Sequence, residues 1–309
     1  MAQANELRKD YILDNWVIIS PARKKRPRDF KKKEEEVKEG ICYFCPGNEH
    51  LTPPEISRVE ENGRWIIRCF PNKFPAVSLE GGSAHGEHEI VVETNEHGKE
   101  LEDLSVDHLV KVLDFYSWRI EKLKSKEGVE YVVLFRNKGK EAGASFTHTH
   151  AQLISLPLVP PIVKEKIAAS KKYADENGTC PYCDILKKEM GGERRILEDE
   201  NACAFAPFAS RFPFEAWIMP KRHIGRIGSM NEDEKRSFAK VFKKIMLKLR
   251  SMLGDPDYNL LFYLAPAGDE LHFHLEICPR IAKWAGFEFG SGIIINTMGP
   301  EDAAGFYRD

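Results

Sequence analysis

The 309-residue chain carries the same ordered series of motifs twice, and this repeat constrains its fold more than any other feature. Each half opens with a Cys-x2-Cys pair, at 42–45 and 180–183, and closes with a His-x-His motif, at 148–150 and 272–274. The cysteine pairs are offset by 138 positions and the His-x-His motifs by 124. An ordered series with nearly constant offsets indicates two copies of one unit of about 150 residues, an ordinary domain size.

The segments between these motifs predict the same secondary structure in both halves. The strand candidates are apolar or rich in β-branched and aromatic residues, and they cover 88–92, 131–135, 214–219 and 258–264. The helices are expected to begin after the N-cap candidates Ser105 and Asn231, because apolar residues then recur at helical spacing. We therefore expect a first domain over 1–160, a connecting helical segment over 161–178 and a second domain over 179–309.

Charge and hydropathy exclude several classes of protein. The 46 Lys and Arg residues nearly balance the 48 Asp and Glu residues, so the net charge of -2 gives no overall attraction to nucleic acid or an anionic membrane. No apolar run approaches the roughly 20 residues of a membrane span, and the first 16 residues lack the apolar stretch of a signal peptide. We therefore expect a cytoplasmic protein that binds neither nucleic acid nor membrane.

Each half supplies four residues with the composition of a structural zinc site, which takes Cys and His ligands in a tetrahedron. Seven cysteines in a chain without a secretion signal make a disulfide framework improbable, and a redox-active cysteine pair is the alternative. The symmetric histidines favour metal and about two zinc ions per chain. The predicted ligands are Cys42, Cys45, His97 and His148 in site 1 and Cys180, Cys183, His223 and His272 in site 2.

The other cysteines and histidines have no such pattern. Cys69, Cys203 and Cys278 stand alone and are expected in the core. Four further histidines have no counterpart in the other half, and they are expected at the surface: His50, His85, His88 and His108.

His150 is the candidate catalytic residue of the first half. Side chains alternate along a strand, so residues 148, 150 and 152 share one face, and a neutral imidazole is a competent nucleophile toward phosphorus. Gln152, one of only two glutamines, can donate to a phosphoryl oxygen, and the preceding 137–145 segment has glycines that allow close approach to an anion. The alternative is that His150 is a core histidine without a catalytic role.

The second copy of the motif carries acidic residues where the first has its glycine loop. Asp269 and Glu270 precede the second His-x-His, and Glu276 stands in the place of Gln152. A carboxylate repels a phosphate, so we expect this copy to keep its metal and to lack the chemistry.

Together these motifs resemble the galactose-1-phosphate uridylyltransferase family of the histidine-triad superfamily. The segments that carry the resemblance are 16–23 with 26–27, 42–48, 72–76, 143–152, 180–185 and 220–223. The resemblance implies an α+β fold of two histidine-triad-like repeats, each an antiparallel sheet packed with helices. It further implies that the repeats form an intramolecular pseudo-dimer and that the protein is a homodimer.

The resemblance also implies a double-displacement mechanism. His150 would attack the α-phosphorus of a nucleotide sugar, form a nucleotidyl-histidine and release a hexose 1-phosphate, and a second phosphate acceptor would reverse the step. The implied catalytic residues are His150, Gln152 and Ser145. The implied nucleotide and phosphate contacts are Arg23, Arg26, Asn72, Asn137, Gly143, Ala144, Ser145 and Gln152, and the implied sugar contacts are Phe287 and Glu288.

The leading interpretation is a uridylyltransferase acting on UDP-glucose and a hexose 1-phosphate in galactose metabolism. Lys73 stands where the uridylyltransferases commonly have Asp, and the 286–292 run is similar to ADP-glucose:phosphate adenylyltransferases, which are the close alternative. A hydrolase of the superfamily would favour His in place of Gln152. A zinc-stabilised nucleic-acid-binding protein is the distant alternative, which the balanced charge opposes.

Overall fold

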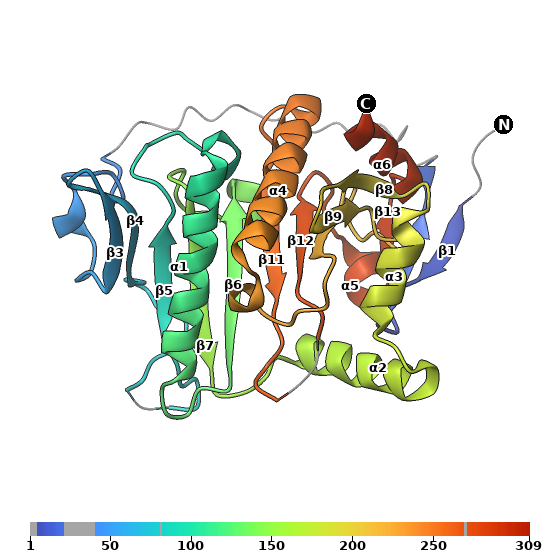
Figure 1. Ribbon diagram of the computed structural model, residues 1–309, viewed down its shortest axis with the longest axis horizontal. Helices are drawn as coiled ribbons and strands as arrows, with labels where there is room; N and C mark the ends of the chain where they lie inside the picture. Colours follow the sequence, from blue (N-terminus) through green and yellow to red (C-terminus); the bar gives the residue numbers. More distant parts are fainter. Residues whose placement is uncertain (1–4, 22–40, 81, 269–270) are drawn as a thin grey trace.

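The computed structural model describes residues 5–21, 41–80, 82–268 and 271–309, and a ten-stranded sheet crosses the molecule from one side to the other (Figure 1). Every pair of neighbouring strands in this sheet is antiparallel. Its strands are β3 (Ser57–Glu61), β4 (Arg64–Pro71), β5 (His88–Val92), β6 (Tyr131–Lys138), β7 (His150–Leu156), β8 (Arg195–Glu198), β9 (Ala202–Phe205), β10 (Ala216–Pro220), β11 (Tyr258–Tyr263) and β12 (His274–Pro279).

The two halves of the chain contribute strands to the sheet in the same order, as their repeated motifs predict. Read from its outer edge inward, the first half runs β3-β4-β5-β7-β6 and the second runs β8-β9-β10-β12-β11. The halves meet where β6 pairs with β11, with Arg136 opposite Leu260. The predicted α+β class with antiparallel strands is therefore confirmed.

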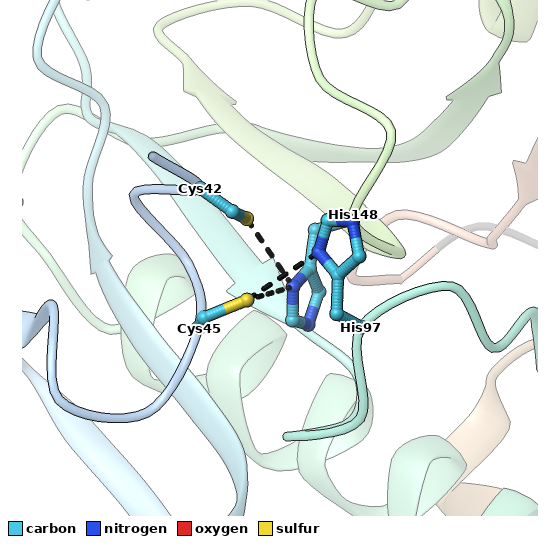
Figure 2. A group of neighbouring side chains, drawn as sticks. All are labelled: Cys42, Cys45, His97 and His148. Atoms are coloured by element: carbon cyan, nitrogen blue, oxygen red, sulfur yellow. Dashed lines mark hydrogen bonds between the residues drawn. The ribbon is translucent and has the colours of Figure 1, made fainter. Parts of the chain in front are cut away.

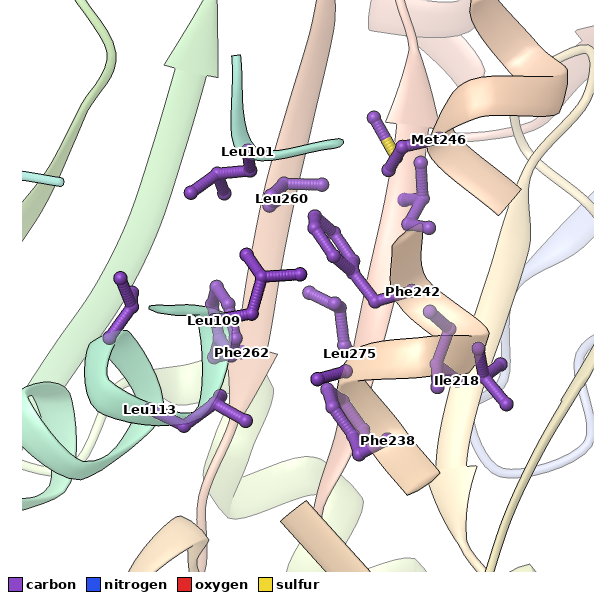
Figure 3. Close-up of a cluster of buried hydrophobic side chains, with 14 of the residues drawn as sticks. Leu101, Leu109, Leu113, Ile218, Phe238, Phe242, Met246, Leu260, Phe262 and Leu275 are labelled. Atoms are coloured by element: carbon purple, nitrogen blue, oxygen red, sulfur yellow. The ribbon is translucent and has the colours of Figure 1, made fainter. Parts of the chain in front are cut away.

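The helices α1 (Val106–Lys124) and α4 (Glu232–Leu253) lie beside each other across one face of the sheet (Figure 1). Both predicted N-caps are confirmed, because Ser105 accepts a hydrogen bond from His108 N–H and Asn231 accepts one from Glu234 N–H. The apolar sides of the two helices pack on the sheet, and Figure 3 shows this core around Leu109, Phe242 and Leu275.

The remaining helices lie mainly with the second half. They are α2 (Pro161–Asn177), which is the predicted connecting segment, α3 (Pro181–Met190), α5 (Gly286–Ser291) and α6 (Pro300–Arg308). A small sheet joins β1 (Glu6–Lys9), β2 (Trp16–Ile19) and β13 (Ile294–Asn296), and short 3-10 turns are η2 (Glu49–Leu51), η3 (Leu101–Asp103), η4 (Lys140–Ala142) and η5 (Ile227–Ser229). Within the described ranges no helix is long and apolar enough to cross a bilayer.

Strand alternation separates the two faces of the sheet. On β7, Ala151 and Leu153 belong to the core beneath α1 and α4, so His150 and Gln152 face the opposite side. On β12, Leu275 belongs to the same core, and its neighbours likewise face away from it. In the second half that opposite face is covered by α2 and α3, which contribute Val163 and Tyr182 to a second core cluster.

The predicted strand boundaries differ from the observed ones by more than one residue at two ends. The strand expected over 131–135 continues to Lys138, where it pairs with the start of β11. The strand expected from Phe214 begins only at Ala216, because Phe214 has a φ of +61°, in the left-handed region that interrupts an extended strand. The predicted core cysteines Cys69, Cys203 and Cys278 are all buried.

Phe242 provides a test of the packing of α4 on the sheet. Replacement of this buried ring by alanine should lower the free energy of unfolding by about 3–5 kcal/mol, because the cavity beside Leu275 cannot fully close. Leu247 lies on the same helix with 38% of its surface exposed, and Leu247→Ala should cost about 0.5 kcal/mol. Urea denaturation measures both, and equal losses would contradict the observed orientation of α4.

Candidate active site and metal centres

The predicted residues of site 1 come together at one end of β7. Cys42 and Cys45 lie in the segment before η2, His97 follows β5, and His148 immediately precedes β7. Their ligand atoms all lie within 4.8 Å of one another, and Figure 2 shows the two thiols and two rings pointing toward a common point. His148 is buried and its Nε2 lies 2.8 Å from the Thr94 carbonyl oxygen, so the ring donates there and turns Nδ1 toward the thiols.

The residues of site 2 form the same arrangement. Cys180 caps α3, Cys183 lies in its first turn, and His223 and His272 follow β10 and precede β12. His272 Nε2 lies 3.0 Å from the Pro220 carbonyl oxygen, the counterpart of the bond that holds His148. Both sets offer two thiols and two imidazole nitrogens, so each can hold a metal ion.

Among the described residues, one ring nitrogen of His150 has a hydrogen-bond partner and the other has none. Its Nδ1 lies 2.8 Å from the His148 carbonyl oxygen, and because a carbonyl only accepts, Nδ1 carries the proton and Nε2 carries a lone pair. Only 5% of the residue is exposed, and burial lowers the pKa of His150 to about 4. The Phe44 ring lies beside it, with the ring centroids 5.3 Å apart. The imidazole is therefore neutral at neutral pH.

Gln152 lies two residues further along β7, and its side chain contacts the ring of His88. The predicted residue Asn72 approaches the same ring. Gln152 Oε1 is 2.8 Å from His88 Nε2, and Asn72 Nδ2 is 3.2 Å from the same ring nitrogen. The expectation that His88 is a surface residue is wrong, since it is only 9% exposed. Strand alternation could have found it, because His88 shares the face of Ile90, which pairs with Gln152.

The glycine loop between β6 and β7 is anchored by the second half of the chain. Gly139 has a φ of +80°, and a Cβ there would lie 2.2 Å from the Asp257 carboxylate, so the close approach requires glycine. Asn259 donates to Asn137 Oδ1 over 2.8 Å and to the Ala142 carbonyl oxygen over 2.9 Å. Sequence reasoning missed both Asp257 and Asn259, whose role depends on the pairing of β6 with β11.

The other residues predicted to contact the nucleotide, the phosphates or the sugar lie in the glycine loop, on α5 or outside the described residues. Ser145 is exposed in the loop before β7, and the N–H groups of Gly143 and Ala144 donate to carbonyls within the loop. Phe287 and Glu288 lie on α5, which packs beside β13. In Figure 1 this helix lies with the second half, away from β7, the strand that begins at His150. Arg23, Arg26, Asp269 and Glu270 lie outside the described residues.

The second-half counterpart of His150 is enclosed. His274 Nδ1 donates to the His272 carbonyl oxygen over 2.8 Å, but its Nε2 lies 3.0 Å from Lys166 Nζ. The ring stacks on Tyr263 at 4.8 Å and on Trp217 at 5.2 Å between centroids. Burial and the Lys166 ammonium lower the pKa of His274 to about 4, so its Nε2 lone pair accepts from the lysine.

The second half differs from the first in its packing as well as in its acidic residues. Glu276 is buried and paired with Lys166 over 2.8 Å and with Arg211, so its charge is compensated within the protein. It is the filling of this face by Lys166 of α2 and by aromatic rings that separates His274 from any ligand.

Comparison with known proteins identifies the family of this site. Residues 76–160 match the sequence model of the galactose-1-phosphate uridyl transferase N-terminal domain. The chain is 34% identical to ADP-glucose phosphorylase of Arabidopsis thaliana, over 99% of this chain and 93% of that protein. It is 33% identical to galactose-1-phosphate uridylyltransferase of Thermotoga maritima, over 98% of each chain.

Solved structures agree with the sequence comparison. The crystal structure of the Arabidopsis thaliana ADP-glucose phosphorylase with bound ADP-glucose superposes with a TM-score of 0.89 at 33% identity, over 99% of both chains. A uridylyltransferase structure superposes with a TM-score of 0.77 at 29% identity, over 99% of this chain and 97% of that one. The protein is thus an enzyme of the nucleotidyltransferase class. It belongs to the galactose-1-phosphate uridylyltransferase family, as its motifs predict.

Substitution of Lys166 tests how this residue is paired beside His274. Lys166→Met leaves the buried Glu276 carboxylate with a single cationic partner, Arg211, and should lower the free energy of unfolding by about 3–5 kcal/mol. The double variant Lys166→Met/Glu276→Leu removes both charges and should be more stable than the single variant. Urea denaturation of the three proteins checks this, and a double variant less stable than Lys166→Met would contradict the pairing.

Proposed function

We propose that this enzyme moves a nucleoside monophosphate between a nucleotide sugar and a hexose 1-phosphate through a covalent nucleotidyl-histidine on His150. The observation that carries the proposal is the bond from His150 Nδ1 to the His148 carbonyl oxygen. This bond fixes the proton on Nδ1, so the Nε2 lone pair is available for attack without prior loss of a proton. His274, which has the same Nδ1 bond, lacks an available lone pair.

The reaction that fits this site has two displacements at phosphorus. In the first, His150 Nε2 forms a bond to the α-phosphorus while the bond to the oxygen of the departing hexose 1-phosphate breaks, and that oxygen keeps the electron pair. In the second, a phosphate oxygen of the acceptor forms the new bond and the histidine leaves. Gln152 shares the strand face of His150, Asn72 approaches the same His88 ring as Gln152, and Asn137 and Ser145 lie at the two ends of the glycine loop. Their proposed role is to bind and stabilise the phosphoryl oxygens.

Zinc is the metal proposed for both clusters, at about two ions per chain. Ligand bonds of about 2.3 Å to sulfur and 2.0–2.1 Å to nitrogen at a tetrahedral angle require a sulfur–nitrogen distance of about 3.6 Å. In site 1 the Sγ atoms of Cys42 and Cys45 lie 3.3–3.6 Å from the Nδ1 atoms of the two histidines, and in site 2 Cys183 Sγ lies 3.5–3.6 Å from those of its two histidines. A bound ion would supply folding free energy and fix His148, whose carbonyl holds His150.

The repeated strand order supports the interpretation of the halves as two histidine-triad-like repeats in an intramolecular pseudo-dimer, with a catalytic domain at 1–160 and a degenerate one at 179–309. We further propose a cytoplasmic homodimer. Phe287 and Glu288 on α5 are remote from His150 in one chain, so sugar contacts from these residues would come from a second copy.

An ADP-glucose:phosphate adenylyltransferase is the second candidate, and the TM-score of 0.89 to the Arabidopsis ADP-glucose phosphorylase favours it. Incubation of the enzyme with UDP-glucose and ADP-glucose separately, followed by intact-mass measurement, distinguishes the two. A uridylyl adduct supports the first function and an adenylyl adduct the second. The absence of any adduct would overturn the covalent mechanism.

Metal content tests the two clusters. Protein purified without chelators should contain about two zinc ions per chain, and Cys42→Ser should lower this by about one, because a thiolate ligand is lost from site 1. Activity should fall as well, because a metal ion then no longer fixes His148, whose carbonyl oxygen accepts the hydrogen bond from His150. Inductively coupled plasma mass spectrometry makes the measurement, and only trace zinc in the unaltered protein would refute the assignment.

The two His-x-His motifs provide a matched pair for the mechanism. His150→Ala should abolish adduct formation while leaving both zinc ions bound, and added imidazole should partly restore turnover to His150→Gly. His274→Ala should keep most of the activity, since its ring accepts from Lys166. Equal loss in both alanine variants would contradict the asymmetry.

Stereochemistry at phosphorus tests the two displacements directly. Two inversions give overall retention, so a chiral thiophosphate substrate should yield a product of unchanged configuration. Phosphorus NMR of that product measures its configuration. Inversion would exclude a covalent intermediate on His150 and would leave this residue no role beyond that of a general base.

A further inference from the structure

His88 occupies a position between two groups that the proposed function uses. It is the first residue of β5, and its ring is buried against Gln152 on the neighbouring strand β7. Three atoms approach its ring nitrogens. The Ala76 backbone N–H reaches Nδ1 over 3.2 Å, Gln152 Oε1 lies 2.8 Å from Nε2, and Asn72 Nδ2 lies 3.2 Å from Nε2.

The Ala76 contact decides where the imidazole carries its proton. A backbone N–H can only donate, so Nδ1 must accept and the proton of the neutral ring lies on Nε2. The other tautomer would place two N–H groups against each other at Ala76 and two lone pairs against each other at Gln152. The imidazolium form would keep the first of these conflicts, and burial lowers the pKa of His88.

Asn72 makes no hydrogen bond to the ring in this assignment, because its amide nitrogen and the protonated Nε2 are both donors. Its Oδ1 accepts from the Phe74 N–H over 2.9 Å, so the group beside the His88 ring is its amide nitrogen. The shorter contact at Nε2 is the one to Gln152, and we take the Nε2 proton to be directed there.

The direction of this hydrogen bond fixes the orientation of the Gln152 amide. A primary amide can present either its oxygen or its NH2 group to a ligand, and nothing in the side chain itself selects between them. Because His88 Nε2–H donates, Gln152 Oε1 must face His88, and the NH2 group faces the other way. The reversed amide would turn a carbonyl oxygen toward a phosphoryl oxygen, and the two would repel each other.

We propose that His88 is a positioning residue, which holds the Gln152 amide as a hydrogen-bond donor toward the reacting phosphoryl group. This inference rests on the proposed nucleotidyl transfer. It also links the segment containing Asn72 and Ala76 to the catalytic amide, because that segment supplies the N–H that sets the proton on His88.

Two amide substitutions at position 88 distinguish the hydrogen bond at Nε2, to Gln152, from the one at Nδ1, from Ala76. In His88→Gln, the longer side chain places an amide donor near the position of Nε2, and we expect a rate of nucleotidyl-enzyme formation within about fivefold of the unaltered enzyme. In His88→Asn, the shorter side chain can accept from Ala76 but cannot reach Gln152. We expect a loss of about 10–100-fold in that rate, below the roughly 100-fold or larger loss typical when a transition-state donor is removed.

A double-mutant cycle tests whether His88 acts through Gln152. Gln152→Leu alone should be slow, and His88→Asn in that background should slow the enzyme no further, because the amide to be oriented is already absent. The loss should appear mainly in kcat rather than in KM, since the donor acts on the transition state. His85→Leu is the matched control, because the His85 ring bonds to the Glu127 carbonyl oxygen and to no other described residue, and it should retain the full rate.

The measurements are rapid-quench intact-mass kinetics of adduct formation and steady-state kcat and KM, on variants with unchanged zinc content and unfolding midpoint. Independent, multiplicative losses at positions 88 and 152, or a His88→Gln variant as slow as His88→Asn, would overturn the inference while leaving the proposed function intact. A lack of adduct in the unaltered enzyme would overturn the proposed function and this inference with it.

Discussion

The geometry of the site depends on how His148 is held. Its Nε2 donates to the Thr94 carbonyl oxygen, its Nδ1 faces the thiols of Cys42 and Cys45, and its backbone carbonyl accepts from His150. One residue thus connects the metal cluster to the candidate nucleophile without any intervening side chain. The rings of His148 and His150 are both buried, so the loss of one of these hydrogen bonds would leave an unpaired polar group in the interior and lower the stability of the fold.

The halves share one strand order and differ in what covers the sheet. In the second half α2 and α3 close the face that carries His274, and Lys166 places its ammonium where a phosphate would have to approach. In the first half the corresponding face is lined by Phe44 and by polar side chains such as Gln152. The connector helix is therefore the element that encloses His274 and has no counterpart over His150 among the described residues.

Much of the fold and of the metal clusters followed from sequence, because both depend on local patterns repeated at constant offsets. The caps Ser105 and Asn231 and the eight cluster residues needed only spacing and residue type. Lys166, His88 and Asn259 could not be found in this way. Each acts across a strand pairing or a helix packing that brings distant segments together, and a charged residue on a predicted connector is more typical of a solvated helix face.

The anchoring of the glycine loop has a consequence for how such a duplicated chain can diverge. Asp257 fills the space beside Gly139, and Asn259 bonds both Asn137 and the Ala142 carbonyl, so the second half of the chain shapes a loop of the first half. A substitution at Asp257 or Asn259 would then alter the loop of the candidate active site from the other half of the chain. The two halves are therefore not structurally independent, and a change beside β11 has to be accommodated by the loop between β6 and β7.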